Sequence, residues 1–241
     1  GDVLYYYGDT KIAKFRHNVK LLHDGTTLTT DYLNYDRIKD IAYYFNGGMI
    51  EDSVNTLTSS RGQYTPYNNQ AVFSDKVRLV HPNFILTSDT LCYNTATNQA
   101  DLVSPTQVIY EKETTILSSK GWYNTQTEFS MLLDRSQIIH ADGMTLTGDT
   151  IYYDKLAGYG NVRGNMQSVD STHRLTLYGN HGEVWENTDS GYATDSAMLV
   201  DWSDSTMYTY IHADTLFTKQ IPARVSILVP KDSILVDSIW V

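Results

Sequence analysis

Hydrophobic and polar residues alternate over short stretches of this chain. In residues 86–94, which read LTSDTLCYN, a single residue separates Leu91 from Tyr93. A period of two is typical of a β-strand with one buried face. Short polar segments such as Asn94–Asn98 follow these stretches and suit hairpin turns. The pattern predicts antiparallel strands, because no segment combines the 3.6-residue period with the caps of an ordinary helix.

The same phrase recurs along the sequence. Leu86-Thr-Ser-Asp89-Thr-Leu91 returns as Leu146-Thr-Gly-Asp149-Thr-Ile151. Extending this alignment gives a column with separations of 29 or 31 residues: Asp2, Asp31, Ser60, Asp89, Lys120, Asp149 and Asn180. Three residues before the column stands a leucine in each of the six units after the first: Leu28, Leu57, Leu86, Leu117, Leu146 and Leu177. The repeat is clear to about residue 195, and only Asp195 and Asp214 echo it further on.

Three further columns accompany the repeat. Tyrosine predominates four residues after the first column, at Tyr6, Tyr35, Tyr64, Tyr93 and Tyr153, with Asn124 and Val184 in the other units. Small residues predominate at the eleventh position: Ala13, Ala42, Ala71, Ala100, Gly160 and Gly191, with Met131 in the remaining unit. Apolar residues occupy the thirteenth: Phe15, Tyr44, Phe73, Leu102, Leu133, Val162 and Ala193. One unit cannot cover such positions alone, so we expect stacked units to join them into continuous rows.

Each unit of about 29 residues accommodates two or three short strands and at least one hairpin. Leu86 and Leu91 lie five positions apart, so a straight strand would place them on opposite faces. A bend or bulge at Ser88-Asp89 would bring both inside. The predicted fold is all-β, an elongated antiparallel β-jellyroll built as a solenoid-like stack with open ends. We expect one repeat-built domain over residues 1–217 and an irregular tail, or the start of further strands, over 218–241.

Composition narrows the function classes. With 18 Lys and Arg against 28 Asp and Glu, the net charge of −10 argues against nucleic acid and against a polybasic hold on anionic lipid. Hydrophobic residues make up 41% of the chain, enough for a substantial core, but no apolar run is long enough for a transmembrane helix. The sequence opens at Gly1 without a signal peptide and ends on apolar residues, so we expect it to be a fragment of a longer chain.

No arrangement of reactive side chains predicts catalysis or a cofactor. The GxSxG, GxGxxG and HExxH motifs are absent, and the single Cys92 excludes an internal disulfide or a CxxC motif. The aspartate column could form a calcium ladder, but one carboxylate per unit better suits hydrogen bonds at a strand corner. The tyrosine column could be a platform for sugar rings or lipid headgroups, or the margin of a core. We therefore expect no enzyme, no cofactor and no metal site.

A family resemblance rests on two phrases. The segment Asp149-x-Ile-x-Tyr153-Asp154, followed by Gly160-Asn161-Val162, resembles the OstA/LptA family, which repeats an Ala-Asp-x-x-x-Tyr-Asp phrase and then a Gly-Asn-Val phrase. Asn18-Val19 matches the second phrase loosely. The aspartate column departs from the family pattern at Ser60, Lys120 and Asn180, and the array is longer than that of the minimal members. It is more similar to the extended OstA-like proteins.

The resemblance implies a periplasmic β-jellyroll that transports lipopolysaccharide toward the outer membrane of a gram-negative cell. Acyl chains of lipid A would lie in an apolar trough, and other β-jellyroll transport components, or copies of this chain head to tail, would stack end to end. An association with the outer membrane is left open. The expected interior lining comprises Phe15, Leu28, Tyr44, Leu57, Phe73, Leu86, Leu102, Leu117, Leu133 and Leu146.

Two other functions are compatible with the repeat. A structural or adhesive surface protein would bind glycan or a protein partner through its tyrosines and its strand edges. A carbohydrate-active enzyme would carry its repeats on a parallel β-helix. Hairpin-length connections such as Asn94–Asn98 favour antiparallel neighbours and therefore disfavour the β-helix.

Overall fold

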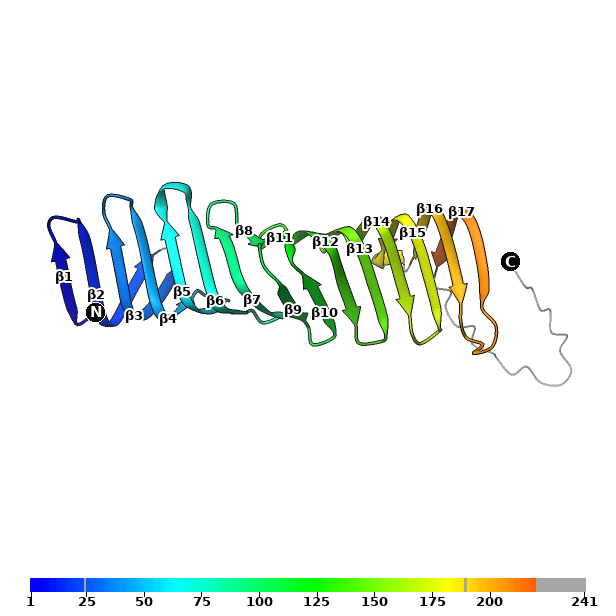
Figure 1. The fold of residues 1–241 in the computed structure, drawn as a ribbon, viewed down its shortest axis with the longest axis horizontal. Helices are drawn as coiled ribbons and strands as arrows, with labels where there is room; N and C mark the ends of the chain where they lie inside the picture. Colours follow the sequence, from blue (N-terminus) through cyan, green and yellow to red (C-terminus); the bar gives the residue numbers. More distant parts are fainter. Residues whose placement is uncertain (24, 189, 220–241) are drawn as a thin grey trace, which may run out of the picture.

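The computed structural model describes residues 1–23, 25–188 and 190–219. Its strands follow one another along the long axis of an elongated roll, with β1 at one end and β17 at the other (Figure 1). In chain order, the strands are β1 (Val3–Tyr7), β2 (Ile12–His23), β3 (Thr26–Asp36), β4 (Ile41–Glu51), β5 (Thr56–Thr65), β6 (Gln70–Val80), β7 (Phe84–Asn94), β8 (Gln99–Leu102), β9 (Thr106–Tyr110), β10 (Thr114–Ser118), β11 (Lys120–Asn124), β12 (Phe129–His140), β13 (Met144–Asp154), β14 (Tyr159–Asp170), β15 (Leu175–Trp185), β16 (Ser190–Asp201) and β17 (Thr209–Lys219). Two short 3-10 helices, η1 (Pro66–Asn68) and η2 (Glu186–Thr188), lie in hairpin loops.

Most successive strands pair antiparallel through short loops, whereas β8 and β9 both pair with β7, and β10 and β11 both pair with β12. The prediction of an all-β antiparallel stack is confirmed. Among the described residues, no helix has the length and apolar character needed to cross a membrane. Strand β17 reaches Lys219, and residues 220–241 lie outside the described residues, so the predicted tail with its boundary at 217/218 stays a prediction.

Most strands turn a corner at mid-length. Opposite Asp31, for example, β2 skips two residues in the register, between Arg16 and Val19. The skipped residues occur in pairs with positive φ, a conformation that Asn, Asp and Gly tolerate best. These pairs are His17/Asn18, Asn46/Gly47, Asp75/Lys76, Asp134/Arg135, Gly164/Asn165 and Asp195/Ser196. Two residues facing one make a bulge that bends the strand. The bend predicted at Ser88-Asp89 does lie at this corner, but the extra residues stand on the partner strand β6, where Asp75 and Lys76 face Asp89.

The corner divides each long strand between two legs, and the short strands β8 to β11 lie in one leg each. We call leg A the part that contains Ile85–Ser88 of β7 and leg B the part that contains Thr90–Asn94. The legs face each other, since the rings of Phe84 in leg A and Tyr123 in leg B lie 6.3 Å apart, centroid to centroid, in an edge-on arrangement. Leu86 and Leu91 are both buried, at 6% and 1% exposure, so the bend brings both inside.

The corner is built differently at the centre of the roll. Val103–Pro105 separates β8 from β9, and Ser119 separates β10 from β11, so two neighbouring strands are interrupted at the same level. Pro105 stands 29 residues after Lys76, which has a φ of 59°. The proline ring fixes φ near −65°, so this unit cannot form the paired left-handed corner used elsewhere.

The register corrects one predicted unit. Gly121 pairs with Leu102 on one side and with Leu132 on the other, which anchors the fifth unit at Ser119 instead of the predicted Lys120. Ser119 lies 30 residues after Asp89 and 30 before Asp149. A slip of one residue in a strand moves every side chain to the other face. The predicted positions of Leu117, Asn124, Met131 and Leu133 are therefore wrong by one residue.

Candidate functional site

Two rows of apolar side chains line the space between the legs. In leg A the cross-strand register joins Leu21, Leu28, Ile50, Leu57, Leu79, Leu86, Val108, Ile116, Ile138 and Leu146. In leg B it joins Phe15, Leu33, Tyr44, Gly62, Phe73, Leu91, Leu102, Gly121, Leu132, Ile151, Val162, Gly182 and Ala193. Residues of both rows pack into a main core cluster, and a smaller cluster forms around Val19, Leu33 and Tyr44.

Most of the predicted lining residues lie in these rows. Five of them are buried: Tyr44, Leu57, Phe73, Leu86 and Leu102. Three are partly buried and pack against the clusters: Phe15, Leu28 and Leu146. Their contact with lipid stays a prediction, because the structure contains protein alone.

The other two predicted lining residues lie outside the rows. Leu117 is 36% exposed and pairs with Gln107 and Gln137, so it belongs to a polar row on the other face of leg A. Leu133 pairs with Lys120 and Thr150, next to the row position. Their row places are taken by Ile116 and Leu132. Leu117 and Leu133 were assigned to the lining because the prediction aligned the fifth unit on Lys120, one residue after Ser119.

The tyrosine and small-residue columns form a single row on leg B. In cross-strand order it reads Tyr6, Ala13, Tyr35, Ala42, Tyr64, Ala71, Tyr93, Ala100, Tyr123, Ser130, Tyr153 and Gly160. Each ring therefore has small side chains beside it, which leaves room for the ring on the sheet. Sequence reasoning missed Tyr123, although a column through Ser119 would have included it.

The tyrosine hydroxyls lie at the polar margin of this row. Tyr35 donates a 2.5 Å hydrogen bond to Asp40 Oδ1, and Tyr153 donates a 2.9 Å hydrogen bond to Glu186 Oε1. Burial and the Glu186 carboxylate raise the pKa of Tyr153. The rings of Tyr64 and Tyr93 pack against the main core cluster, and the hydroxyls of Tyr35 and Tyr153 bind loop residues, so these members of the row match the margin-of-core interpretation.

The free ends of the legs meet at a mouth opposite the corner. Tyr110, the last residue of β9 in leg A, accepts a hydrogen bond from Lys155, the first residue after β13 in leg B. The Lys155 ammonium also lies 4.5 Å from the centroid of the Tyr110 ring and 3.8 Å from Glu128 Oε2. The hydrogen bond to Tyr110 raises the pKa of Lys155. Together with the Phe84–Tyr123 contact, this pairing closes the mouth at the centre of the roll.

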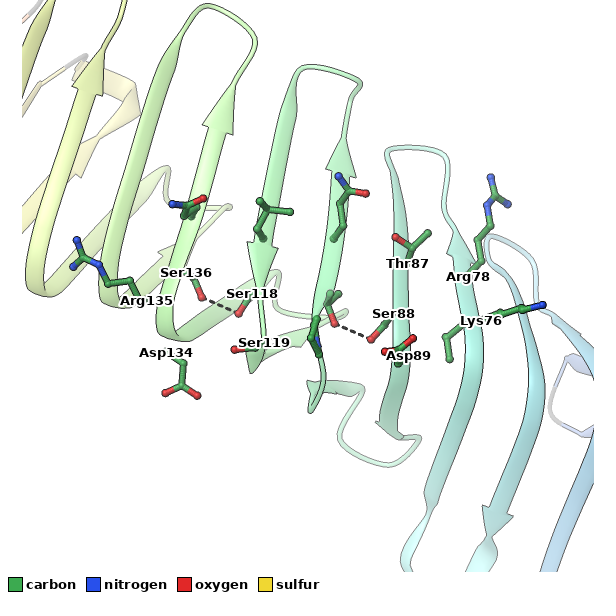
Figure 2. Close-up of a pocket in the computed structure, with 16 residues that line it drawn as sticks. Lys76, Arg78, Thr87, Ser88, Asp89, Ser118, Ser119, Asp134, Arg135 and Ser136 are labelled. Atoms are coloured by element: carbon green, nitrogen blue, oxygen red, sulfur yellow. Dashed lines mark hydrogen bonds between the residues drawn. The ribbon is translucent and has the colours of Figure 1, made fainter.

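A polar groove follows the corner on the outside of leg A. It has a volume of about 830 Å³ and is lined by residues of β6, β7, β9, β10 and β12, with Pro105 and Ser119 at the interrupted strands (Figure 2). Buried hydroxyls stabilise its floor: Ser88 Oγ lies 2.8 Å from Thr106 Oγ1, and Ser136 Oγ donates a 2.8 Å hydrogen bond to Ser118 Oγ. These hydroxyl contacts link neighbouring strands where the ladder is broken. Nothing in the sequence pattern predicted this groove.

The aspartate column takes part in corner hydrogen bonds. Asp31 Oδ1 accepts the backbone N–H of Asn18 at 3.1 Å, and Asp149 Oδ2 accepts the Asn165 side-chain amide at 2.6 Å. Arg135 lies 3.5 Å from the other oxygen of Asp149. These carboxylates fix the left-handed corner residues opposite them, which is the corner role expected of the column.

Taken together, the two legs and their facing rows define an elongated antiparallel β-jellyroll of stacked units with an apolar interior. The chain belongs to the family of OstA-like proteins, whose family model matches residues 1–89 and 76–139. The predicted family is thereby confirmed. A second match that restarts at residue 76 is expected of a chain built from repeats.

One similar solved structure is LptH, the LptA homologous periplasmic component of the conserved lipopolysaccharide transport device from Pseudomonas aeruginosa. The two proteins are 15% identical, the similarity covers 39% of this chain and 73% of that chain, and the TM-score is 0.36. No curated protein matches this sequence.

Proposed function

We propose that this protein binds lipopolysaccharide in the periplasm and holds its acyl chains between the two legs on the way to the outer membrane. Membership of the OstA-like family supports the proposal. The observation that carries it is the pair of continuous apolar rows, from Leu28 to Leu146 in leg A and from Phe15 to Ile151 in leg B. Each methylene group transferred from water to such a surface gains about 0.8 kcal/mol, so several acyl chains bind without an ionic site.

The ligand enters by separating packed side chains. Leu91 and Ile151 are buried in the closed interior, whereas Leu79 and Tyr93 are only partly buried. Acyl chains lie along the partly buried parts of the rows and spread the legs. The trough is a passive conduit: the protein binds and carries without catalysis, and the energy for directional flow comes from other components.

End-to-end stacking with other β-jellyroll components, or with copies of this chain, extends the trough. Strand β1 pairs with β2, and its five side chains are all exposed. Leu4 pairs with Phe15 and so continues the apolar row of leg B. A strand added beside β1 would cover this row and satisfy exposed backbone groups. In this proposal residues 1–217 act as one carrier domain.

Photocrosslinking tests lipid contact. A photoreactive amino acid at Leu86 or Phe73 is expected to give adducts with lipid A when the protein is loaded with lipopolysaccharide. A neighbouring pair supplies the matched control: Ile116 lies in the row and is expected to crosslink, whereas Leu117 lies in the polar outer row and is not. If neither Leu86 nor Phe73 forms an adduct, the carrier function is wrong.

The adhesive alternative predicts a different ligand. Hydroxyls of Tyr35 and Tyr153 are engaged by loop residues, which leaves the tyrosine row less suited to sugar rings. A fluorescent lipid A analogue should bind and be displaced by lipopolysaccharide but not by free glycan. Displacement by glycan, or binding of glycan alone, would favour the adhesin.

A further inference from the structure

We infer that the central unit is the lateral entrance of the trough, and that Lys155 binds the phosphate of the incoming ligand there. The ligand class is a phosphorylated, multiply acylated amphiphile whose acyl chains pass between the legs. This inference rests on the proposed carrier function, and it adds the place of entry and the residue that recognises the headgroup.

The first observation is the contact across the mouth. Tyr110 and Lys155 are 45 residues apart in sequence and belong to opposite legs, yet their side chains are hydrogen-bonded. Phe84 and Tyr123 form a second contact between the legs beside it. Any ligand that enters laterally at this point must separate these two pairs. The contacts are therefore a latch, which we define as Phe84, Tyr110, Tyr123 and Lys155.

The second observation is the interrupted corner of the same unit. Tyr110 ends β9, which begins after the break at Val103–Pro105, and Tyr123 lies in β11, which begins after the break at Ser119. The latch residues of these two strands are thus joined to the other leg through short irregular segments. At the other corners, a continuous bulged strand fixes the angle between the legs. The central unit consequently combines a corner at which two neighbouring strands are interrupted with a latch across the mouth.

The third observation concerns charge. The Lys155 side chain is 32% exposed, and the charged or titratable groups around it are Glu128, Tyr110 and Tyr123, with Tyr153 and Glu186 in the neighbouring margin. Its carboxylate partner, Glu128 Oε2, is 3.8 Å away, a loose pairing, and its closest partner is the neutral hydroxyl of Tyr110. A phosphate group is a stronger partner for an ammonium than a phenol. Binding of phosphate to Lys155 would release Tyr110 and open the latch.

Replacement of the lysine tests recognition of the phosphate. K155M is expected to weaken binding of bisphosphorylated lipid A about tenfold, the loss typical of one charge-assisted hydrogen bond, and K155R is expected to restore it. Dephosphorylated lipid A should bind K155M at least as well as wild type, because the methionine removes the hydrogen bond to Tyr110 and this ligand has no phosphate to lose a partner. K39M, which removes an exposed lysine from another hairpin of leg B, is the matched control and should leave binding unchanged. Equal binding of bisphosphorylated lipid A by wild type and K155M would overturn the assignment.

A competition experiment with inorganic phosphate distinguishes binding of a lipid headgroup from binding of a free anion. Inorganic phosphate at millimolar concentration is not expected to displace lipid A, because the acyl chains supply most of the affinity. If inorganic phosphate displaces it, the latch binds an isolated anion and the entrance proposal fails.

Crosslinking tests the route of entry. In a Cys92→Ala background, Tyr110→Cys and Lys155→Cys joined by a short bis-maleimide should slow loading of lipid A severalfold compared with the same protein before crosslinking. The control pair, Arg78→Cys and Thr87→Cys, lies on neighbouring strands of leg A and does not cross the mouth. Its crosslink should not change the loading rate.

The outcomes distinguish the two proposals. If wild-type protein binds no lipid A, the carrier function fails. If wild type binds it and the mouth crosslink leaves the loading rate unchanged, only the lateral entrance is wrong.

Discussion

The ring of Tyr44 lies directly against the backbone of Gly48. A Cβ atom at Gly48 would come within 2.5 Å of Tyr44 Cε2, and the opposite edge of the ring lies against Gly62. The buried hydroxyl is 2.5 Å from Ser59 Oγ, and burial raises the pKa of Tyr44. A large aromatic residue in the leg B row is therefore accommodated by two glycines, Gly48 beyond the corner of the same strand β4 and Gly62 on the neighbouring strand β5.

Gly48→Ala is predicted to destabilise the protein by about 1–3 kcal/mol, because the added methyl group overpacks the site beneath Tyr44. Gly8→Ala is the control, since no atom lies within 4 Å of a Cβ at that position. Urea unfolding followed by circular dichroism measures both. Adding Tyr44→Leu to Gly48→Ala should recover part of the loss; equal stability of the two glycine variants would contradict the packing.

Leu132 and Leu133 are predicted to differ in their contribution to stability. Leu132 is 6% exposed and pairs with Ile151 in the leg B row, so truncation to alanine should cost about 2–5 kcal/mol. Leu133→Ala should cost less, roughly 1 kcal/mol, because that side chain is only half-buried on the other face. Urea midpoints of the two variants test the register directly. The reverse order would restore Lys120 as the anchor of this unit.

Alkaline pH is predicted to reveal the environment of Tyr153. Burial and Glu186 raise the pKa of Tyr153 above its ordinary value of 10.0, so the folded state retains the phenol proton where the unfolded state loses it. The free energy of unfolding should therefore fall as pH rises above about 10, and Tyr153→Phe should reduce this slope. Tyr67→Phe, at an exposed hairpin tip, is the control. Urea unfolding between about pH 9 and about pH 11 measures the effect, and an unchanged slope in Tyr153→Phe would contradict it.

Leu4→Lys is predicted to weaken any end-to-end association. Leu4 is 59% exposed in β1 and continues the row of Phe15, so a charged residue there would oppose stacking of a further unit. Analytical ultracentrifugation over a range of protein concentrations is the measurement. Leu156→Lys, which places the same charge on an exposed apolar residue between β13 and β14, is the control. Association of Leu4→Lys as strong as that of wild type would rule out this end as the contact.

The repeat pattern of the sequence was enough to predict the antiparallel strands, the bend within them and most residues of the apolar rows. The leucines three residues before the aspartate column and the tyrosines four residues after it recur because they face equivalent neighbours in successive units. Their spacing in the sequence was therefore enough to find them. The fifth unit misled the alignment, since Leu117 continues the leucine column while Ile116 occupies the row. A recurring residue type does not prove that the side chains lie on the same face of the sheet. The pairing register of the strands is needed to assign the face.

Contacts between the legs could not be predicted in the same way. Tyr110 and Lys155 occupy different units and different positions within them, so no column contains both. Pro105 was visible in the sequence, but its consequence depends on the left-handed corners of the other units, which only the backbone shows. The polar groove likewise needs five strands brought side by side.

The corner that most units share has a consequence for how such a chain can grow. Each of these units bends its strands with a local pair of left-handed residues and contacts only its neighbours, so duplication of such a unit inserts two strands without disturbing the rest. Each insertion would lengthen the molecule by roughly 10 Å. The length of the molecule can thus be adjusted in fixed increments while the cross-section stays constant.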